Sequence, residues 1–188
     1  MCLNPPENAA VFCVEEKSVI QALDRLDRRL PLSPGRAEKH GFEYCRHGTL
    51  PLYAALNPRT GEVIGQTAAR HTSEEFVSFL DVVVSTQPSD REIHAILDNF
   101  STHKTSLVKA YLPEHPTVTL HFTPTYSSWL NQVECWFCKL QRDVVDRGIF
   151  TSVTDLRRKI MRYVRLNQKT AKPFQWKYSD VRKRIPEW

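Results

Sequence analysis

Three short stretches decide the fold and the chemistry of this chain: Val11-Phe-Cys-Val-Glu-Glu16, Ile96-Leu-Asp-Asn99 and Asn131-Gln-Val-Glu-Cys-Trp-Phe137. Each one places a carboxylate beside a strongly apolar segment, and a carboxylate taken out of water needs a compensating positive charge. Mg²⁺ takes oxygen ligands, usually one or two carboxylates together with substrate phosphates, so three such groups brought together would suit this cation. The stretches therefore predict a metal-dependent phosphoryl-transfer domain.

The segments around these stretches alternate between strand and helix patterns. Strands are expected at 10–15, 48–56, 62–67, 92–98 and 117–122. Helices are expected after a capping box at Thr72–Glu75, and at 103–112, 127–146 and 153–166. This order of elements predicts an α/β fold, namely a mixed five-stranded sheet with helices on both faces.

Composition indicates one globular domain without membrane spans. The 188 residues carry a formal net charge of +5, which favours a polyanionic partner. The sequence contains no apolar run long enough to cross a bilayer and no signal peptide pattern, and its five scattered cysteines suit a reducing cytoplasm. We expect an N-terminal lead at 1–9, the folded domain at 10–169 and a basic C-terminal tail at 170–188.

Each candidate acid also has an ordinary structural interpretation. Asp98 could serve only as a turn or helix-capping residue, and Glu134 could be a solvated side chain at the edge of an apolar stripe. The polar and aromatic segment 124–132 that leads into the helix of Glu134 favours the functional interpretation. For Cys135 and Cys138, buried packing is a better explanation than a zinc site, because no second cysteine pair accompanies them.

Four strings in this order carry a family resemblance: Val14-Glu-Glu-Lys-Ser18, Tyr44-Cys-Arg-His-Gly48, Leu97-Asp-Asn-Phe-Ser-Thr-His-Lys104 and His121-Phe-Thr-Pro-Thr-Tyr-Ser-Ser-Trp-Leu-Asn-Gln-Val-Glu134. Together they resemble the catalytic domain of bacterial insertion-sequence transposases of the mariner-related DDE superfamily. The resemblance spans about residues 10 to 176. It implies a ribonuclease-H-like fold at 10–169 and DNA strand cleavage and strand transfer as the activity.

The resemblance also implies the ligands and partners of the domain. In that family three acids hold two divalent metal ions, usually Mg²⁺, with Mn²⁺ as a substitute. Asp98 matches the second acid and Glu134, thirty-six positions later, matches the third. The implied partners are DNA, as transposon ends and target, and a second copy of the chain in a homodimer. The implied location is the bacterial cytoplasm, in association with the nucleoid.

The first acid is where this chain departs from the family. An aspartate normally stands in the Val-Asp-Glu-Lys string, whereas this chain has Glu15, and Glu16 matches the glutamate that follows. The extra methylene moves the carboxylate oxygens outward, and a misplacement of about 1 Å can lower a rate on the order of a hundredfold. We therefore predict a site that binds metal but has reduced activity.

Further residues are candidates for contact with DNA: Lys17, Arg46, His47, His103, Lys104, Tyr126, Trp129 and Asn131. For the lone histidines, His121 included, a structural role is favoured, because no local pattern defines a pair of metal ligands. For Trp136, core packing is favoured over stacking on bases.

Two other functions stay open from the sequence. The recognition helices that precede the catalytic domain in related transposases do not match any part of this sequence, so weak, salt-sensitive and sequence-independent DNA binding is expected. A catalytically inactive remnant that binds DNA or dimerises as a regulator is the main alternative, and Glu15 favours it. A ribonuclease-H-like nuclease of another purpose is more remote.

Overall fold

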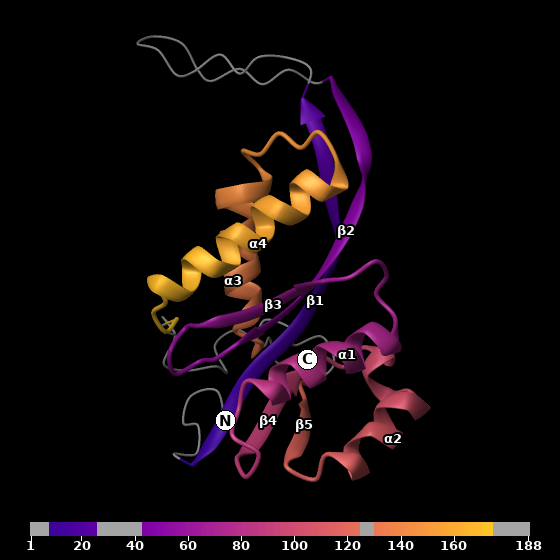
Figure 1. Cartoon of the computed structure of the whole chain (residues 1–188), viewed down its shortest axis with the longest axis vertical. Helices are drawn as coiled ribbons and strands as arrows, with labels where there is room; N and C mark the ends of the chain where they lie inside the picture. The colour runs from indigo at the N-terminus through magenta and orange to yellow at the C-terminus, as the bar shows by residue number, and fades with distance from the viewer. Residues whose placement is uncertain (1–7, 26–42, 125–129, 175–188) are drawn as a thin grey trace, which may run out of the picture.

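A five-stranded mixed sheet forms the centre of the computed structural model, which describes residues 8–25, 43–124 and 130–174 (Figure 1). Its strands are β1 (Ala9–Arg25), β2 (Tyr44–Leu56), β3 (Val63–Thr67), β4 (Glu92–Leu97) and β5 (Val118–Phe122). They lie in the order β3-β2-β1-β4-β5. The β1–β2 and β2–β3 pairs are antiparallel, whereas the β1–β4 and β4–β5 pairs are parallel.

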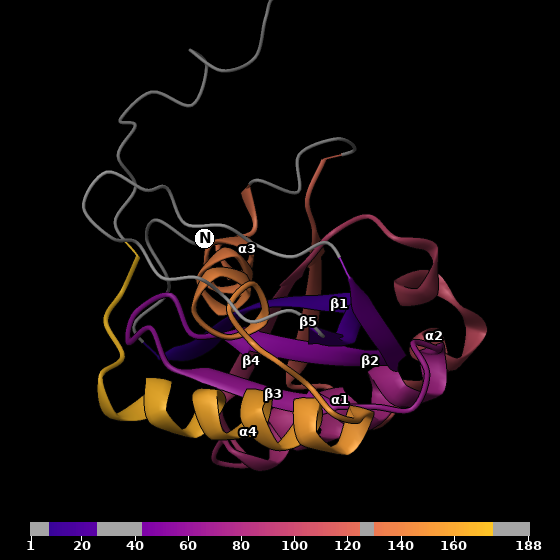
Figure 2. The same ribbon diagram turned by 90° about the horizontal axis from the view of Figure 1, so that it is seen from above.

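Helices cover both faces of this sheet, as the sequence predicted (Figures 1 and 2). They are α1 (Ser73–Ser85), the 3₁₀ turn η1 (Ser101–Lys104), α2 (Ser106–Glu114), α3 (Val133–Leu140), the π-helical turn η3 (Gln141–Val145) and α4 (Val153–Lys169). One apolar core lies between the sheet and α3 with α4, and the other lies between the sheet and α1 with α2. None of the helices in the described part of the chain is long and apolar enough to cross a membrane.

The central strand β1 divides its side chains between the two cores. Val11 and Cys13 belong to the core under α3 and α4, whereas Phe12 and Val14 belong to the core under α1 and α2. This follows from the two-residue period of a strand, which sends successive side chains to opposite faces. The same alternation sends the next two residues, Glu15 and Glu16, to opposite sides of the sheet.

The structure differs from the sequence prediction at the bounds of several elements. β2 begins at Tyr44 instead of 48, and α4 continues to Lys169 instead of 166. β1 continues to Arg25 instead of ending at 15, because Ile20 and Ala22 are buried against β2 and the strand absorbs two register shifts on the way. The expected helix at 103–112 is divided by Thr105, whose backbone is extended. The expected helix at 127–146 is described only from residue 130 onward. In this part an α-helix begins at Val133 and becomes π-helical at Gln141.

The hairpin loop between β2 and β3 is closed by Asn57 and Gly61. The Gly61 N–H donates to the Asn57 carbonyl (2.8 Å), and the Asn57 N–H donates to the Glu62 carbonyl (2.9 Å). Gly61 has a φ of +75°, and an added Cβ would lie 2.1 Å from the backbone oxygen of Lys172. The loop therefore requires glycine twice, once for its backbone conformation and once because the segment after α4 passes against it.

Candidate active site

The parallel pairing of β1 with β4 places two of the candidate acids side by side. Cys13 on β1 is the register partner of Ile96 on β4. Continuing this register by two residues brings Glu15 alongside Asp98, on the face that Cys13 and Ile96 share. Asp98 directly follows the end of β4, and Glu15 lies beside it on β1, just beyond the last pair of the parallel register. The carboxyl end of a parallel strand is the usual place for ligand-binding groups in α/β sheets.

The third acid reaches the same edge from α3. Glu134 stands in the first turn of this helix, which packs against β1 and β2 through Val133 and Phe137. Glu134 is partly buried, and its charge interacts with Asp98 and with Lys17. Three carboxylates from segments far apart in the sequence are therefore brought together.

The pKa values of Glu15 and Glu134 reflect the closeness of these carboxylates. Burial raises the pKa of the Glu15 carboxyl to about 8, and the negative charges of Asp98, Glu16 and Glu134 add to the effect. Burial also raises the pKa of Glu134, where the charge of Lys17 acts in the opposite direction and that of Asp98 in the same direction. The cluster thus holds more negative charge than its protein surroundings compensate.

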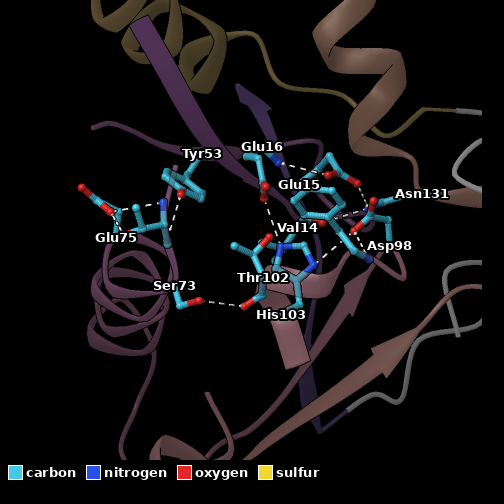
Figure 3. A network of polar contacts seen from close by, with 12 residues as sticks. Val14, Glu15, Glu16, Tyr53, Ser73, Glu75, Asp98, Thr102, His103 and Asn131 are labelled. Atoms are coloured by element: carbon cyan, nitrogen blue, oxygen red, sulfur yellow. Dashed lines mark hydrogen bonds and ion pairs between the residues drawn. The ribbon is translucent and has the colours of Figure 1, made fainter. Parts of the chain in front are cut away.

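Asn131 connects the start of α3 to the first acid. Its amide Nδ2 donates to the Val14 carbonyl (2.9 Å) and lies 3.5 Å from the Glu15 Oε2 (Figure 3). The residue is fully buried, and its Oδ1 has no hydrogen-bond partner among the described residues. An unpaired buried oxygen beside two carboxylates adds a further oxygen donor to the cluster.

His103 contacts both Asp98 and Glu16, the latter of which leaves β1 on the side opposite Glu15 (Figure 3). The His103 Nε2 lies 3.0 Å from the Glu16 Oε2, and its Nδ1 lies 3.1 Å from the Asp98 Oδ1. Burial lowers the pKa of His103, but the hydrogen bond to Glu16 and the charges of Glu16, Asp98 and Glu15 outweigh it, so the net shift is upward. The ring is therefore protonated more readily than an ordinary histidine, and its protonated form would place positive charge beside Glu16 and Asp98.

The donor set suits a hard cation better than a soft one. Within residues 8–24, 43–124 and 130–174, no three His, Cys, Asp or Glu side chains form a ready-made metal cluster. The carboxylates of Glu15, Asp98 and Glu134 nevertheless act on one another strongly enough to raise the pKa of Glu15. An oxygen donor set under mutual repulsion fits Mg²⁺ or Mn²⁺, which would relieve the repulsion.

The structure distributes the candidate DNA contacts unevenly around these acids. Lys17 is half-buried and lies near Glu134. Lys104 is exposed at the end of η1, where its ammonium contacts the Asn99 side chain and lies 5.1 Å from the centre of the Phe122 ring. These two lysines flank the cluster.

Arg46 and His47 lie far from the acids. They stand on the part of β2 that pairs with the end of β1, where Arg46 is opposite Leu23, whereas Glu15 is opposite Ala54. Eight residues of strand separate these levels, or about 26 Å. There the Arg46 guanidinium donates to the Tyr44 hydroxyl (3.0 Å), and the His47 Nε2 lies 3.5 Å from Asp24. Neither residue shares a site with the acids in this structure.

The remaining sequence interpretations have mixed outcomes. His121 is held in the sheet by His94 (2.9 Å), and Trp136 is fully buried, both as predicted. The prediction that Cys135 and Cys138 are buried is wrong, because both lie on the exposed side of α3. Tyr126 and Trp129 lie outside the described residues.

The sequence interpretation missed two relationships within the site. It assigned no role to Glu16 and treated Asn131 only as a possible DNA contact. For His103 it favoured a structural role over contact with DNA or metal, but it named no partner for the ring. Both His103 and Asn131 are buried against acids. The alternation of side chains along β1 could have indicated a separate role for Glu16, because it places Glu16 on the face of the sheet opposite to that of Glu15. No local pattern could have linked Glu16 to His103, which is 87 positions away.

Comparison with known proteins gives matches to a protein family, to a curated relative and to solved structures. The profile of the family described as DDE superfamily endonuclease matches residues 12–157. The insertion element IS630 uncharacterized 39 kDa protein of Shigella sonnei is 27% identical over 143 residues, which cover 76% of this chain and 38% of that protein. The chain therefore spans well under half the length of this curated relative.

Solved structures of Mos1 share the fold. A pre-cleavage Mos1 transpososome matches with a TM-score of 0.62 at 12% identity, over 83% of this chain and 48% of the Mos1 chain. The Mos1 transposase paired-end complex with left transposon end matches with a TM-score of 0.63 at 13% identity, over 85% and 48%. The Mos1 mariner paired end complex with Mn matches with a TM-score of 0.61 at 13% identity, over 83% and 48%.

Proposed function

This chain belongs to the DDE superfamily endonuclease family, and from this premise we propose that it cleaves DNA strands and transfers them as the catalytic domain of an insertion-sequence transposase. Its fold is ribonuclease-H-like, as the resemblance in the sequence implied and the Mos1 structures bear out. Within this sequence we assign the catalytic domain to 10–169, with 1–9 and 170–188 as flanking segments.

The convergence of Glu15, Asp98 and Glu134 is the observation that carries this proposal. Glu15 and Asp98 lie side by side just beyond the parallel pairing of β1 with β4, and Glu134 stands in the first turn of a packed helix. Each is held by backbone that the two apolar cores fix in place. A rigid set of acids is what phosphoryl transfer requires, because its catalysis consists mainly of positioning and charge stabilisation.

We assign the metal-binding role to the same three acids. Two divalent ions, when bound, would activate the attacking water or DNA 3′-hydroxyl and stabilise the leaving oxygen. One of the Mos1 structures that share this fold is a paired end complex with Mn, which supports the choice of a divalent cation. Asp98 is oriented for this role by the Phe100 N–H, which donates to its Oδ1 (3.1 Å). Lys17 and Lys104 flank the acids and would contact DNA phosphates.

Nicking of supercoiled plasmid with Mg²⁺ or Mn²⁺ tests the proposed activity. Asp98→Asn and Glu134→Gln should each lower the rate at least about a hundredfold, because each removes a charged oxygen ligand. Glu114→Gln is the matched control, since this glutamate is exposed at the end of α2. Wild-type nicking by either acid variant would contradict the assignment.

Glu15 is proposed to limit the activity. Its longer side chain displaces the carboxylate. In the absence of a cation, its pKa of about 8 also keeps most of the carboxyl protonated at neutral pH, whereas only the ionised form binds a cation well. We expect Glu15→Asp to nick DNA about ten times faster or more, with the larger gain in Mg²⁺, whose geometry is strict. Equal rates for the two proteins would refute the impairment.

The same observation supports the alternative function of an inactive transposase remnant that binds DNA or dimerises as a regulator. In that case neither the chain nor Glu15→Asp would nick DNA, while DNA binding would persist. Transposon ends and target DNA are the proposed partners, in keeping with the paired-end complexes of Mos1. We also propose that the chain acts as a homodimer and that it is located in the bacterial cytoplasm, near the nucleoid.

A further inference from the structure

We propose that His103 and Glu16 form a positioning pair that fixes Asp98 from the side of the sheet opposite Glu15. This inference rests on the proposed function, in which Asp98 is a catalytic acid. It gives a role to the second glutamate of the Glu15-Glu16 string. It also changes the role of His103 from a possible DNA contact to a buried support.

The backbone places the pair where it can act on Asp98. Because strand residues alternate, Glu16 leaves β1 toward α1 and α2, on the side where η1 carries His103. His103 follows Asp98 by five residues, so the turn after β4 brings its ring back beneath that acid. The ring then lies between the two carboxylates, with one nitrogen toward each (Figure 3).

The two contacts of the ring differ in kind. The bond from Nε2 to the Glu16 Oε2 (3.0 Å) is a hydrogen bond with a buried carboxylate. The Nδ1 is close to the Asp98 Oδ1 (3.1 Å) but lacks the alignment of a hydrogen bond, so this is a close packing contact. Glu16 therefore fixes the orientation of the ring, and the ring in turn limits the positions open to the Asp98 carboxylate.

Burial separates this role from contact with DNA. The His103 side chain has no exposed surface, and that of Glu16 is only 7% exposed. The ring packs against Phe76, with centroids 4.4 Å apart, and against Phe100, at 6.3 Å. The Ser73 hydroxyl donates to the Thr102 carbonyl (3.2 Å) and holds η1 to α1. A phosphate could not reach the ring without displacing these neighbours.

Packing alone does not explain the arrangement. An apolar ring of similar size would fill the space between Phe76 and Phe100 equally well. It would, however, leave the carboxylate of Glu16 buried without this partner, which is unfavourable. The pair of polar contacts is thus the feature that distinguishes positioning from simple core filling, and His103→Phe separates the two.

The experiment compares four proteins: the wild type, His103→Phe, Glu16→Gln and the double variant. Plasmid nicking gives kcat and KM, and electron paramagnetic resonance of free Mn²⁺ gives the Mn²⁺ affinity. Each single variant should lower kcat and Mn²⁺ affinity about 10- to 100-fold, with KM for DNA changed less than about twofold. In the double variant, kcat and Mn²⁺ affinity should be no lower than in the less active single variant, because both substitutions break the same pair.

His115→Phe is the matched control. This histidine also stacks on an aromatic ring, Tyr111 at 4.0 Å, and lies 3.8 Å from a carboxylate, Asp81, but it is remote from the candidate acids. Its kcat and Mn²⁺ affinity should equal those of the wild type. Thermal unfolding of every variant shows whether a loss of rate merely follows a loss of folded protein.

A measurement without metal or activity completes the test. Long-range ¹H–¹⁵N spectra of the histidine rings should show the Nε2 resonance of His103 moving in Glu16→Gln but not in His115→Phe. An unmoved resonance overturns the pair. If the wild type nicks DNA, a His103→Phe variant with unchanged kcat and Mn²⁺ affinity would also overturn the pair.

The outcomes also separate this inference from the proposed function. If neither the wild type nor Glu15→Asp nicks DNA, but Mn²⁺ affinity still falls in His103→Phe and the resonance moves in Glu16→Gln, the proposed function fails and the positioning pair is supported. If the wild type nicks DNA and the variants have the same kcat and Mn²⁺ affinity, the proposed function is supported and the positioning pair fails.

Discussion

Glu15 links the candidate site to the stability of the fold, because the protein keeps its carboxylate out of water beside Asp98. The folded chain binds the Glu15 proton more tightly than the unfolded chain does, with a pKa of about 8 against the ordinary value of 4.5. The resulting stability is fully present below about pH 4.5 and is lost as the pH rises toward 8. The acid that would hold a cation is therefore a source of instability without one.

We expect Glu15→Gln to stabilise the metal-free protein at pH 8. The amide removes a buried charge worth a few kcal/mol at most, so Tm should rise by about 5 °C, while the two proteins should differ little at pH 4.5. Thermal unfolding in the presence of a chelator measures this difference. Mn²⁺ should then raise the Tm of the wild type more than that of the variant. A variant less stable than the wild type at pH 8 would show that Glu15 is not under repulsion.

Asn131 should support the first acid rather than contact DNA. Asn131→Leu keeps the size of the side chain but removes the donor to the Val14 carbonyl and the contact with Glu15. We expect kcat for nicking to fall about tenfold or more and KM for DNA to stay unchanged. Stability should fall by about 1–3 kcal/mol, because the Val14 carbonyl loses its buried partner. A rise in KM with unchanged kcat would instead assign Asn131 to DNA binding.

At the scale of elements, local patterns carry most of the fold. The alternation at Val11–Val14 and the apolar stripe of α1 were sufficient to predict strands, helices and the faces that they bury. The length of β1 was not predictable, because the residues after Lys17 do not alternate regularly between polar and apolar and are held in the strand by pairing with β2 across two register shifts. Likewise, Asp98 and Glu134 were singled out by their place beside apolar segments, and the resemblance then gave them roles. The contact of His103 with Glu16, by contrast, depends on tertiary packing that no short stretch encodes.

The hairpin loop between β2 and β3 should be the most sensitive turn of the sheet. Gly61→Ala puts a side chain on a residue with φ of +75° and against the Lys172 backbone, so it should lower stability by about 3 kcal/mol. Gly65→Ala, in the neighbouring β3, is the control, because its Cβ would lie closest to side chains rather than backbone: Val164 at 3.1 Å and Leu52 at 3.8 Å. Urea unfolding compares the two. Equal losses would mean that the backbone of the loop is not constrained as described.

For the whole molecule, net charge and the position of the acids set the expectation for DNA. The chain has a formal charge of +5, and Lys17 and Lys104 flank the candidate site. We expect binding to duplex DNA that hardly depends on sequence and weakens steeply with salt, as counterion release requires. Fluorescence anisotropy at KCl concentrations from well below to well above the physiological value measures the slope. Nanomolar preference for one terminal sequence at physiological salt would contradict this expectation.

The order of strands in the sheet also has a consequence for how the protein is made. β1 leaves the ribosome first, yet its parallel neighbour β4 follows only after β2, β3 and α1, and β5 later still. The early part of the chain can form only the β1–β2–β3 meander, whose exposed β1 edge awaits β4. Synthesis thus delays assembly of the reactive centre until α3 has emerged. A nascent chain interrupted earlier, before β4, would display the unpaired edge of β1 to chaperones and proteases.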